Sequence, residues 1–150
     1  MSLRIITTTI ALIGASFTVQ ANSECEVSID ASDQMKFSTD ILSIPSSCKE
    51  VKVTLNHTGS LPAQSMGHNI VITDTALFQA VGIDGMSAGI DNNYVKPNDN
   101  RVYAFTRIIG GGESTSVTFS TEKMKAGGDY SFICSFPGHW AIMRGKFEFK

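Results

Sequence analysis

Three side chains with metal-binding chemistry lie close together near the end of the chain. They are Cys134, His139 and Met143, in the spacing Cys-x4-His-x3-Met. Between them, Pro137 and Gly138 favour a sharp turn. A tight loop can bring a thiolate, an imidazole and a thioether to one point, whereas neighbouring side chains of a straight strand point to opposite faces. The spacing therefore indicates a candidate metal site in a loop.

The chain has three cysteines, an odd number that leaves at least one thiol unpaired. We expect a disulfide between Cys25 and Cys48, because Cys134 is better explained as a metal ligand. The rival pairings would leave Cys25 or Cys48 free. Taken alone, Cys134 also fits a buried and inert thiol in a strand-like run. The expected bond closes a loop of about two dozen residues, which should stabilise the fold by roughly 3 kcal/mol.

The donor types favour copper. Soft sulfur ligands combined with imidazole select copper over hard cations. Structural zinc usually takes four Cys or His ligands and iron–sulfur clusters need several thiolates, more than one free cysteine supplies. A second imidazole is available from His68, which opens an apolar run after Gly67. Two histidines, one cysteine and a weak axial methionine are the ligands of copper sites that transfer electrons.

The first residues indicate export. Arg4 gives a positive start, residues 5–17 are largely apolar, and the segment ends in a small-residue cleavage site, so residues 1–21 are predicted to be a secretory signal. A membrane-spanning anchor and a lipid anchor on Cys25 are the alternatives, and the apolar run is short for a span. We expect one domain over 22–150, with no membrane anchor in the mature form, in an oxidising space that permits disulfides.

The elements that must hold these ligands are strands. Apolar and polar residues alternate around Val51, Val53 and Leu55, which is typical of a half-buried strand. Similar strands are predicted at 25–30, 117–119 and 146–150, a further strand-like run lies at 130–134, and strands buried on both faces are predicted at 69–73 and 102–109. Turn residues separate these runs, so we expect an all-β sandwich or barrel. The net charge of −2 argues against nucleic acid as a partner.

One segment departs from the strand pattern. Residues 75–82 place apolar side chains at helical spacing, with Thr75 as the expected N-cap. Gly82, Gly85 and Gly89 then disfavour a long helix. The prediction is one short helix inserted between strands.

With these motifs in view, the chain resembles the cupredoxin family of blue-copper proteins over essentially all of residues 22–150. The matching segments are Cys25 with Cys48, Asp33-Gln34-Met35, Leu61-Pro62, Met66-Gly67-His68-Asn69, Asp84-Gly85-Met86, Tyr94-Val95-Lys96-Pro97, Ser116-Val117-Thr118-Phe119 and Cys134-Ser135-Phe136-Pro137-Gly138-His139. The resemblance implies an eight-stranded Greek-key sandwich with a small helical flap.

The resemblance also implies roles for the candidate ligands. His68, Cys134 and His139 would be the equatorial ligands of one copper ion. Met143 would be the long axial ligand, and the carbonyl of Gly67 the weak axial contact on the opposite side.

Further residues around the site acquire implied roles. Asn69 and the backbone N–H of Phe136 would donate toward the Cys134 sulfur. His57 matches a histidine that lies near the copper without binding it. Two positions depart from the family pattern: Ile70 stands where a buried Trp is common, and Trp140 follows the His139 ligand where small residues are usual, so we expect Trp140 at the mouth of the site.

The function implied is that of a periplasmic carrier, which transfers single electrons through a type 1 copper site cycling between Cu(I) and Cu(II) and is not an enzyme. Redox proteins of the cytochrome or reductase type would dock weakly on an apolar patch around His139. Its expected members are Met35, Leu61, Met66, Met86, Phe136 and Ala141. The alternatives are a copper-buffering protein with the same ligands, and an enzyme with Cys134 as nucleophile and His139 as base, which would explain neither Met143 nor His68.

Overall fold

The strand with the clearest alternation in the sequence, β4 (Glu50–His57), buries every second side chain. Val51, Val53 and Leu55 are fully buried, while the residues between them reach the outer face. β4 pairs in parallel with β1 (Glu26–Ser32) and antiparallel with β7 (Ser114–Ser120). One face of this sheet is therefore apolar and must be covered, which is the role of a second sheet.

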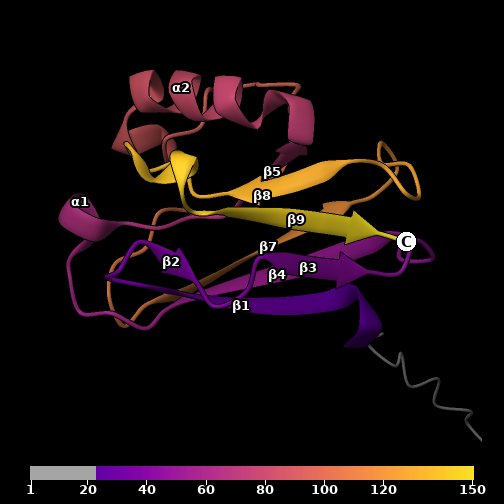
Figure 1. The fold of residues 1–150 in the computed structure, drawn as a ribbon, viewed down its shortest axis with the longest axis horizontal. Helices are drawn as coiled ribbons and strands as arrows, with labels where there is room; N and C mark the ends of the chain where they lie inside the picture. Colours follow the sequence, from indigo (N-terminus) through magenta and orange to yellow (C-terminus); the bar gives the residue numbers. More distant parts are fainter. Residues whose placement is uncertain (1–22) are drawn as a thin grey trace, which may run out of the picture.

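The computed structural model describes residues 23–150, and in them two sheets pack face to face (Figure 1). The strand order is β2-β1-β4-β7 in one sheet and β3-β9-β8-β5-β6 in the other. The remaining strands are β2 (Lys36–Phe37), β3 (Ile41–Ile44), β5 (Val71–Asp74), β6 (Val102–Phe105), β8 (Tyr130–Ile133) and β9 (Arg144–Phe149). The predicted signal over 1–21 lies outside the described residues.

A single extended stretch crosses from one sheet to the other. Its first part, β2, pairs antiparallel with β1, and its second part, β3, pairs in parallel with β9. This division accounts for nine strand segments in the described chain where the family resemblance implied eight strands. The expected sandwich architecture is confirmed, and the crossing stretch ties its two layers together covalently.

The prediction for residues 102–109 was wrong in extent and burial. The strand β6 ends at Phe105, and that side chain is 41% exposed, because β6 lies at the edge of its sheet and pairs only with β5. The chain beyond it continues as a loop that bonds to the segment before β5, where Thr106 N–H donates to the Ile70 carbonyl at 2.9 Å. Of the two strands that were predicted to be buried on both faces, only β5 has this burial.

The inserted helix is longer than predicted. A 3-10 turn, η2 (Thr75–Leu77), leads into α2 (Phe78–Ala88), which passes through two of the glycines that were expected to end it. Thr75 is no N-cap, because its hydroxyl donates to an Asp129 carboxylate oxygen at 2.9 Å. Helix α2 lies over β5 and β8, on the outer face of the five-stranded sheet (Figure 1).

The other helical turns are short. They are η1 (Ser23–Cys25), α1 (Ala63–Met66), η3 (Ile90–Asn92) and η4 (His139–Ala141). None of the helices in residues 23–150 is long and apolar enough to cross a membrane.

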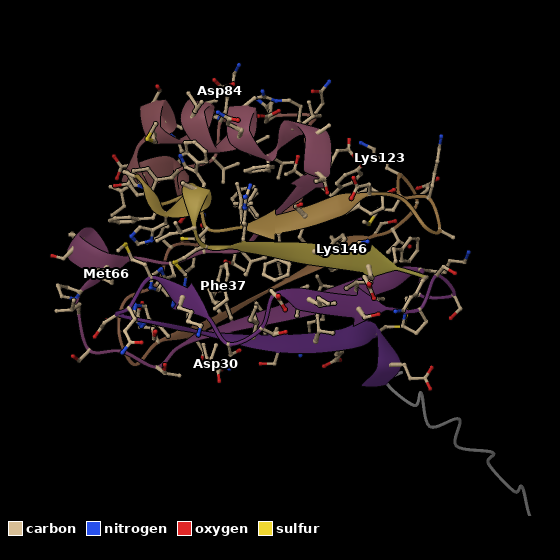
Figure 2. The ribbon with its side chains drawn as sticks, viewed as in Figure 1. Asp30, Phe37, Met66, Asp84, Lys123 and Lys146 are labelled. Carbon is tan, nitrogen blue, oxygen red and sulfur yellow. A yellow bond between two sulfur atoms is a disulfide. The ribbon has the colours of Figure 1, made fainter. Side chains whose placement is uncertain are left out.

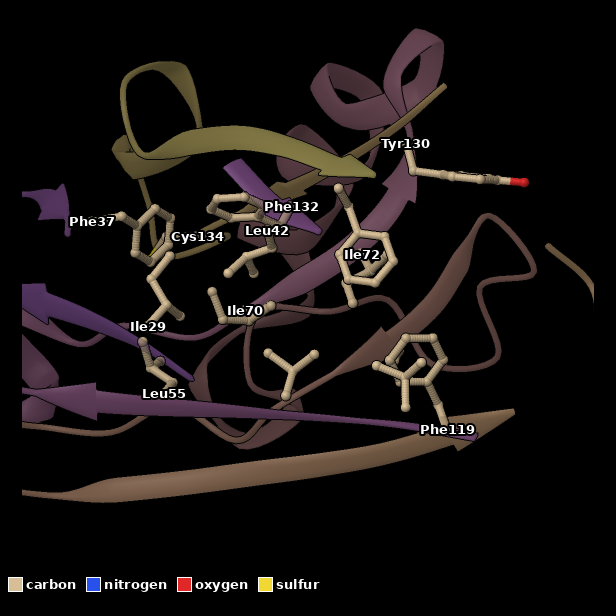
Figure 3. Packing of buried hydrophobic residues seen from close by; sticks show 14 of the residues in the cluster. Ile29, Phe37, Leu42, Leu55, Ile70, Ile72, Phe119, Tyr130, Phe132 and Cys134 are labelled. Carbon is tan, nitrogen blue, oxygen red and sulfur yellow. The ribbon is translucent and has the colours of Figure 1, made fainter. Parts of the chain in front are cut away.

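The core lies between the two sheets (Figure 3). Ile70, where a buried Trp is common in the family, is fully buried there, and Phe132 and Phe147 are its largest fully buried residues. Polar side chains such as those of Asp84 and Lys123 lie on the outside of the layers (Figure 2). The predicted disulfide is present: it joins Cys25 to Cys48.

Candidate metal centre

The loop between β8 and β9 carries three of the predicted ligands. Cys134 directly follows β8 and Met143 directly precedes β9, and the loop is closed by a hydrogen bond of 3.0 Å from Cys134 N–H to the Met143 carbonyl. At its tip, Gly138 takes a positive φ of 81°, which favours glycine, and η4 begins at His139. The His139 N–H donates to the Phe136 carbonyl at 2.9 Å. The turn predicted from Pro-Gly is therefore real.

The fourth side chain, His68, comes from the segment before β5. Its backbone exchanges two hydrogen bonds with Ile109, at 2.9 and 3.0 Å. Its ring Nε2 lies 2.9 Å from the Ser32 carbonyl, which can only accept, so Nε2 carries the proton of the neutral ring. The lone pair of Nδ1 is therefore free for a metal.

These groups converge on one point. The Cys134 Sγ lies 3.7 Å from His68 Nδ1 and 3.6 Å from His139 Nδ1. The three ligand atoms all lie within 4.8 Å of one another, and all three residues are buried. The carbonyl of Gly67 lies 3.9 Å from the same sulfur, and Met143 is buried with 1% exposure. Three of the predicted ligands, His68, Cys134 and His139, thus meet in one buried cluster, and Met143 is buried at the end of the same loop.

Burial keeps the metal-free site electrically neutral. It raises the pKa of the Cys134 thiol to about 12, although the backbone N–H groups of Asn69 and Phe136 lower it in part. Burial also lowers the pKa of both His68 and His139 to about 4. Both imidazoles are therefore uncharged near neutral pH, with one ring nitrogen of each unprotonated, and a metal must displace the thiol proton. A thiol held protonated in this way is no activated nucleophile, which argues against the Cys–His enzyme.

A buried network joins the two parts of the site. The Asn69 side-chain carbonyl accepts from Ser135 N–H at 2.8 Å, and its amide donates to the Ser135 hydroxyl and the Asn93 carbonyl, each at 2.8 Å. The Asn69 side chain therefore fastens the residue after Cys134, and its own backbone N–H faces the sulfur. The sequence suggested a donor at Asn69 but gave no sign of Ser135 as its partner.

His57 lies beside the cluster without joining it. Its ring stacks on the His68 ring with a centroid distance of 4.5 Å. Gly59 N–H donates to Nδ1 at 3.1 Å, so the neutral ring carries its proton on Nε2, which donates to the Met66 carbonyl at 2.9 Å. Both ring nitrogens of His57 are therefore occupied by hydrogen bonds, which fits a histidine that lies near the copper without binding it.

The surface near His139 differs in part from expectation. Met35, Leu61 and Met86 are each about two-fifths exposed, as an apolar patch requires. Phe136, an expected member, is buried instead, with its ring 4.6 Å from that of His139. Trp140 is half-buried against α2 and is not fully open at the mouth of the site.

The donor set fits copper. Two neutral imidazoles, one thiol and a buried thioether side chain are the soft and borderline ligands that copper prefers, and the cluster in the described residues contains no carboxylate. The Ser32 carbonyl, which orients His68, could not be found from the sequence because every residue has a carbonyl.

The comparisons agree with this chemistry. Residues 23–150 match the family model "Copper binding proteins, plastocyanin/azurin family". The chain is 53% identical over 128 residues to an azurin of Pseudomonas denitrificans, covering 85% of this chain and all of that one. It is 52% identical over 124 residues to an azurin of Alcaligenes faecalis, covering 83% and 97%.

Among solved structures, the azurin Az-iso2 from Methylomonas sp. strain J superposes with a TM-score of 0.81 at 44% identity, covering 84% of this chain and 98% of that one. Fold, ligand cluster and relatives lead to one conclusion. The chain belongs to the plastocyanin/azurin family of copper-binding proteins.

Proposed function

We propose that this protein carries single electrons through one type 1 copper ion held by His68, Cys134 and His139, with Met143 and the Gly67 carbonyl as weaker axial contacts. When bound, copper supplies a one-electron couple between Cu(II) and Cu(I). The observation that carries the proposal is the convergence of the Cys134 sulfur and two imidazole nitrogens, 3.6 and 3.7 Å apart, in a buried site.

The residues around the ligands serve to limit rearrangement between the two oxidation states. The Ser32 carbonyl holds the His68 ring, and the hydrogen bond between Cys134 and Met143 closes the ligand loop. The backbone N–H groups of Asn69 and Phe136 act on the sulfur, and such donors tune the potential of a metal site. No substrate is transformed in this function.

Electrons would enter and leave on the His139 side. His139 directly follows Pro137 and Gly138, which are exposed, and Met35 and Leu61, two expected members of an apolar patch around His139, are also exposed. An apolar patch of this kind suits weak and short-lived docking of a redox protein, of the cytochrome or reductase type. The predicted signal over residues 1–21 and the disulfide support a place in the periplasm.

The test is to add Cu(II) to the metal-free protein and record visible absorption and paramagnetic-resonance spectra. We expect an intense blue colour and the narrow copper hyperfine splitting of a thiolate-bound site. Repeated reduction and reoxidation by a redox protein should return the full colour each time. A colourless complex would contradict the proposed ligands, and a blue complex that cannot cycle would favour copper buffering.

A further inference from the structure

Helix α2 presents one face to the ligand loop. The face is formed by Phe78, Gly82 and Gly85, spaced i, i+4 and i+7, so that they lie on one side of the helix. Both glycines are buried, although glycine is a poor helix former. Their position inside an α-helix therefore needs a reason from packing.

Gly82 faces Trp140, the residue after His139 in η4. A Cβ atom at position 82 would lie 2.5 Å from Trp140 Cγ and 2.8 Å from Cδ1. Both distances are too short for real carbon contacts, and these atoms belong to the rigid base of the indole. Only glycine at position 82 allows the Trp140 ring to come this close to the helix.

Two flanking contacts extend along the same helix face. A Cβ at Gly85 would lie 2.2 Å from the Tyr94 carbonyl oxygen, so the Tyr94 backbone is what requires this glycine, while Ser135 Cβ at the start of the loop would be at an ordinary 3.6 Å. The guanidinium of Arg144, just after the loop, lies over the Phe78 ring at 4.6 Å from its centroid. Helix α2 thus contacts the tip of the ligand loop at Trp140 and the residue after the loop at Arg144.

Packing alone holds the indole in place. Trp140 packs against a small apolar cluster formed by Val71, Val81, Val95 and Ile133. Its Nε1 is buried and has no hydrogen-bond partner among residues 23–150. The space left by the missing side chain of Gly82, which we call the Gly82 notch, therefore fixes the ring, and no polar bond does.

The His139 ring lacks a polar anchor of its own. Among the described residues its ring is hydrogen-bonded only to the Cys134 sulfur, through Nδ1. Its direction then depends on the backbone of η4 and on the neighbouring Phe136 ring. Trp140 is the residue of η4 that is seated in α2, so it ties this backbone to the helix.

We infer that Trp140, seated in the Gly82 notch of α2, is a positioning residue for the copper ligand His139. The inference rests on the proposed function, in which His139 binds copper. Trp140 itself does not bind the metal. The pair fixes the angle at which the imidazole approaches the sulfur, and through it the reduction potential and the spectrum of the site.

The first test uses the metal-free protein, in which Trp140 is the only tryptophan. Gly82→Ala should push the indole out of its notch, so its emission maximum should move to longer wavelength and acrylamide should quench it more strongly. The His139 amide, bonded to the Phe136 carbonyl, should exchange its hydrogen several-fold faster. Ser87→Ala, at an exposed site on the same helix, is the control and should change neither readout.

The second test uses the copper-loaded protein. Gly82→Ala and Trp140→Ala should each shift the reduction potential and the copper hyperfine splitting. Trp140→Phe keeps an aromatic ring and should restore values near those of the original protein. In the Trp140→Ala background, adding Gly82→Ala should cause little further change, because the two residues act through one contact.

The outcomes separate this inference from the proposed function. If the original protein gives no blue complex with Cu(II), the proposed function is wrong. The positioning role is tested separately in the metal-free protein: it is wrong if Gly82→Ala leaves the hydrogen-exchange rate of the His139 amide unchanged. Gly82→Ala could shift the Trp140 emission maximum but leave the His139 amide exchange rate and the copper spectrum unchanged. Trp140 would then only pack against α2 without positioning His139, and the inference would be overturned. Equal effects of Ser87→Ala would also overturn it. If Gly82→Ala does not fold, the test passes to position 140. Trp140→Ala should then change the His139 amide exchange rate, the reduction potential and the copper hyperfine splitting, and Trp140→Phe should restore them.

Discussion

The two imidazoles of the site are held in different ways. On one side, the His68 ring bonds to the Ser32 carbonyl, stacks on His57, and has its backbone paired with Ile109. On the other side, the His139 ring is bonded only to the shared sulfur in the described chain. Polar bonds to the backbones of Ser32 and Ile109 fix the first, and loop closure with apolar packing fixes the second. Side-chain substitutions should therefore disturb the His139 side more easily.

Removing the atom shared by both sides should have the largest effect. Cys134→Ser replaces the thiolate whose charge transfer to Cu(II) gives the blue colour, so the intense visible band should disappear. Absorption after addition of Cu(II) measures it. A variant that stays blue would refute the ligand assignment for both sides at once.

Removing the disulfide should weaken the fold and spare both sides of the site. Replacing Cys25 and Cys48 together by serine should lower the free energy of unfolding by roughly 3 kcal/mol, because the unfolded chain gains freedom. Denaturant unfolding measures the loss, and the blue colour should largely remain. Complete loss of copper binding would contradict the separation of this bond from the site.

Breaking the link between the two sides should cost less. Asn69→Ala removes three hydrogen bonds, two of them fully buried, and leaves the Ser135 backbone N–H without its acceptor, at a cost of about 2 kcal/mol. Denaturant unfolding of the metal-free protein measures this. Asn100→Ala, at an exposed site, is the control and should change stability by less than about 0.5 kcal/mol. Equal losses in both variants would mean that the Asn69 network is not what holds the two sides together.

A change of the proposed axial ligand, Met143, should alter the copper site without abolishing copper binding. Met143→Gln should keep copper bound and shift its reduction potential, because the axial ligand is a weak tuner. Potentiometry of the loaded protein measures the shift. An unchanged potential would argue against axial ligation by Met143.

The smallest effect concerns the Asp99 carboxylate, which shares the Arg101 guanidinium with Asp84 of α2. Arg101 binds Asp84 of α2 at 2.5 Å and Asp99 at 2.6 Å, and the hydrogen bonds from Arg101 hold the pKa of the Asp99 carboxyl below its ordinary value of 3.8. Stability from this carboxylate is complete above the unfolded-state pKa and is lost as pH falls through the lower folded-state pKa.

We therefore expect Asp99→Asn to be less stable than the original protein at pH 6, with the difference shrinking as the pH falls below about 4. Unfolding curves of the two proteins across this range measure it. A stability difference that stays constant with pH would show that the Asp99 charge is not the cause.

Local patterns in the sequence predicted the ligands and the half-buried strands. Alternation at Val51 to Leu55 survives in the structure because one face of β4 is buried and one is not. Cys134 and His139 could be found together because their chemistry is rare and their spacing fits one loop. Such features depend on neighbours in the chain, which the sequence displays.

Features that depend on distant contacts were missed or misjudged. Glycine disfavours a helix by about 1 kcal/mol, so Gly82 and Gly85 argued for an early end. The structure keeps them because the helix must approach Trp140 and the Tyr94 carbonyl closely. The edge position of β6 likewise depends on strand order, which propensity does not reveal.

The parallel pairing of β3 with β9 has a consequence for how the chain reaches this structure. Ile41 pairs with Lys146, so two segments more than 100 residues apart in the chain must meet before the second sheet is complete. Such topologies fold slowly, on the order of milliseconds to seconds. Until β9 docks, the thiol at position 134 stays accessible, whereas Cys25 and Cys48 are near neighbours in the chain. Early oxidation of that local pair would protect the third cysteine from mispairing, and trapping of disulfide intermediates during stopped-flow refolding would reveal the order.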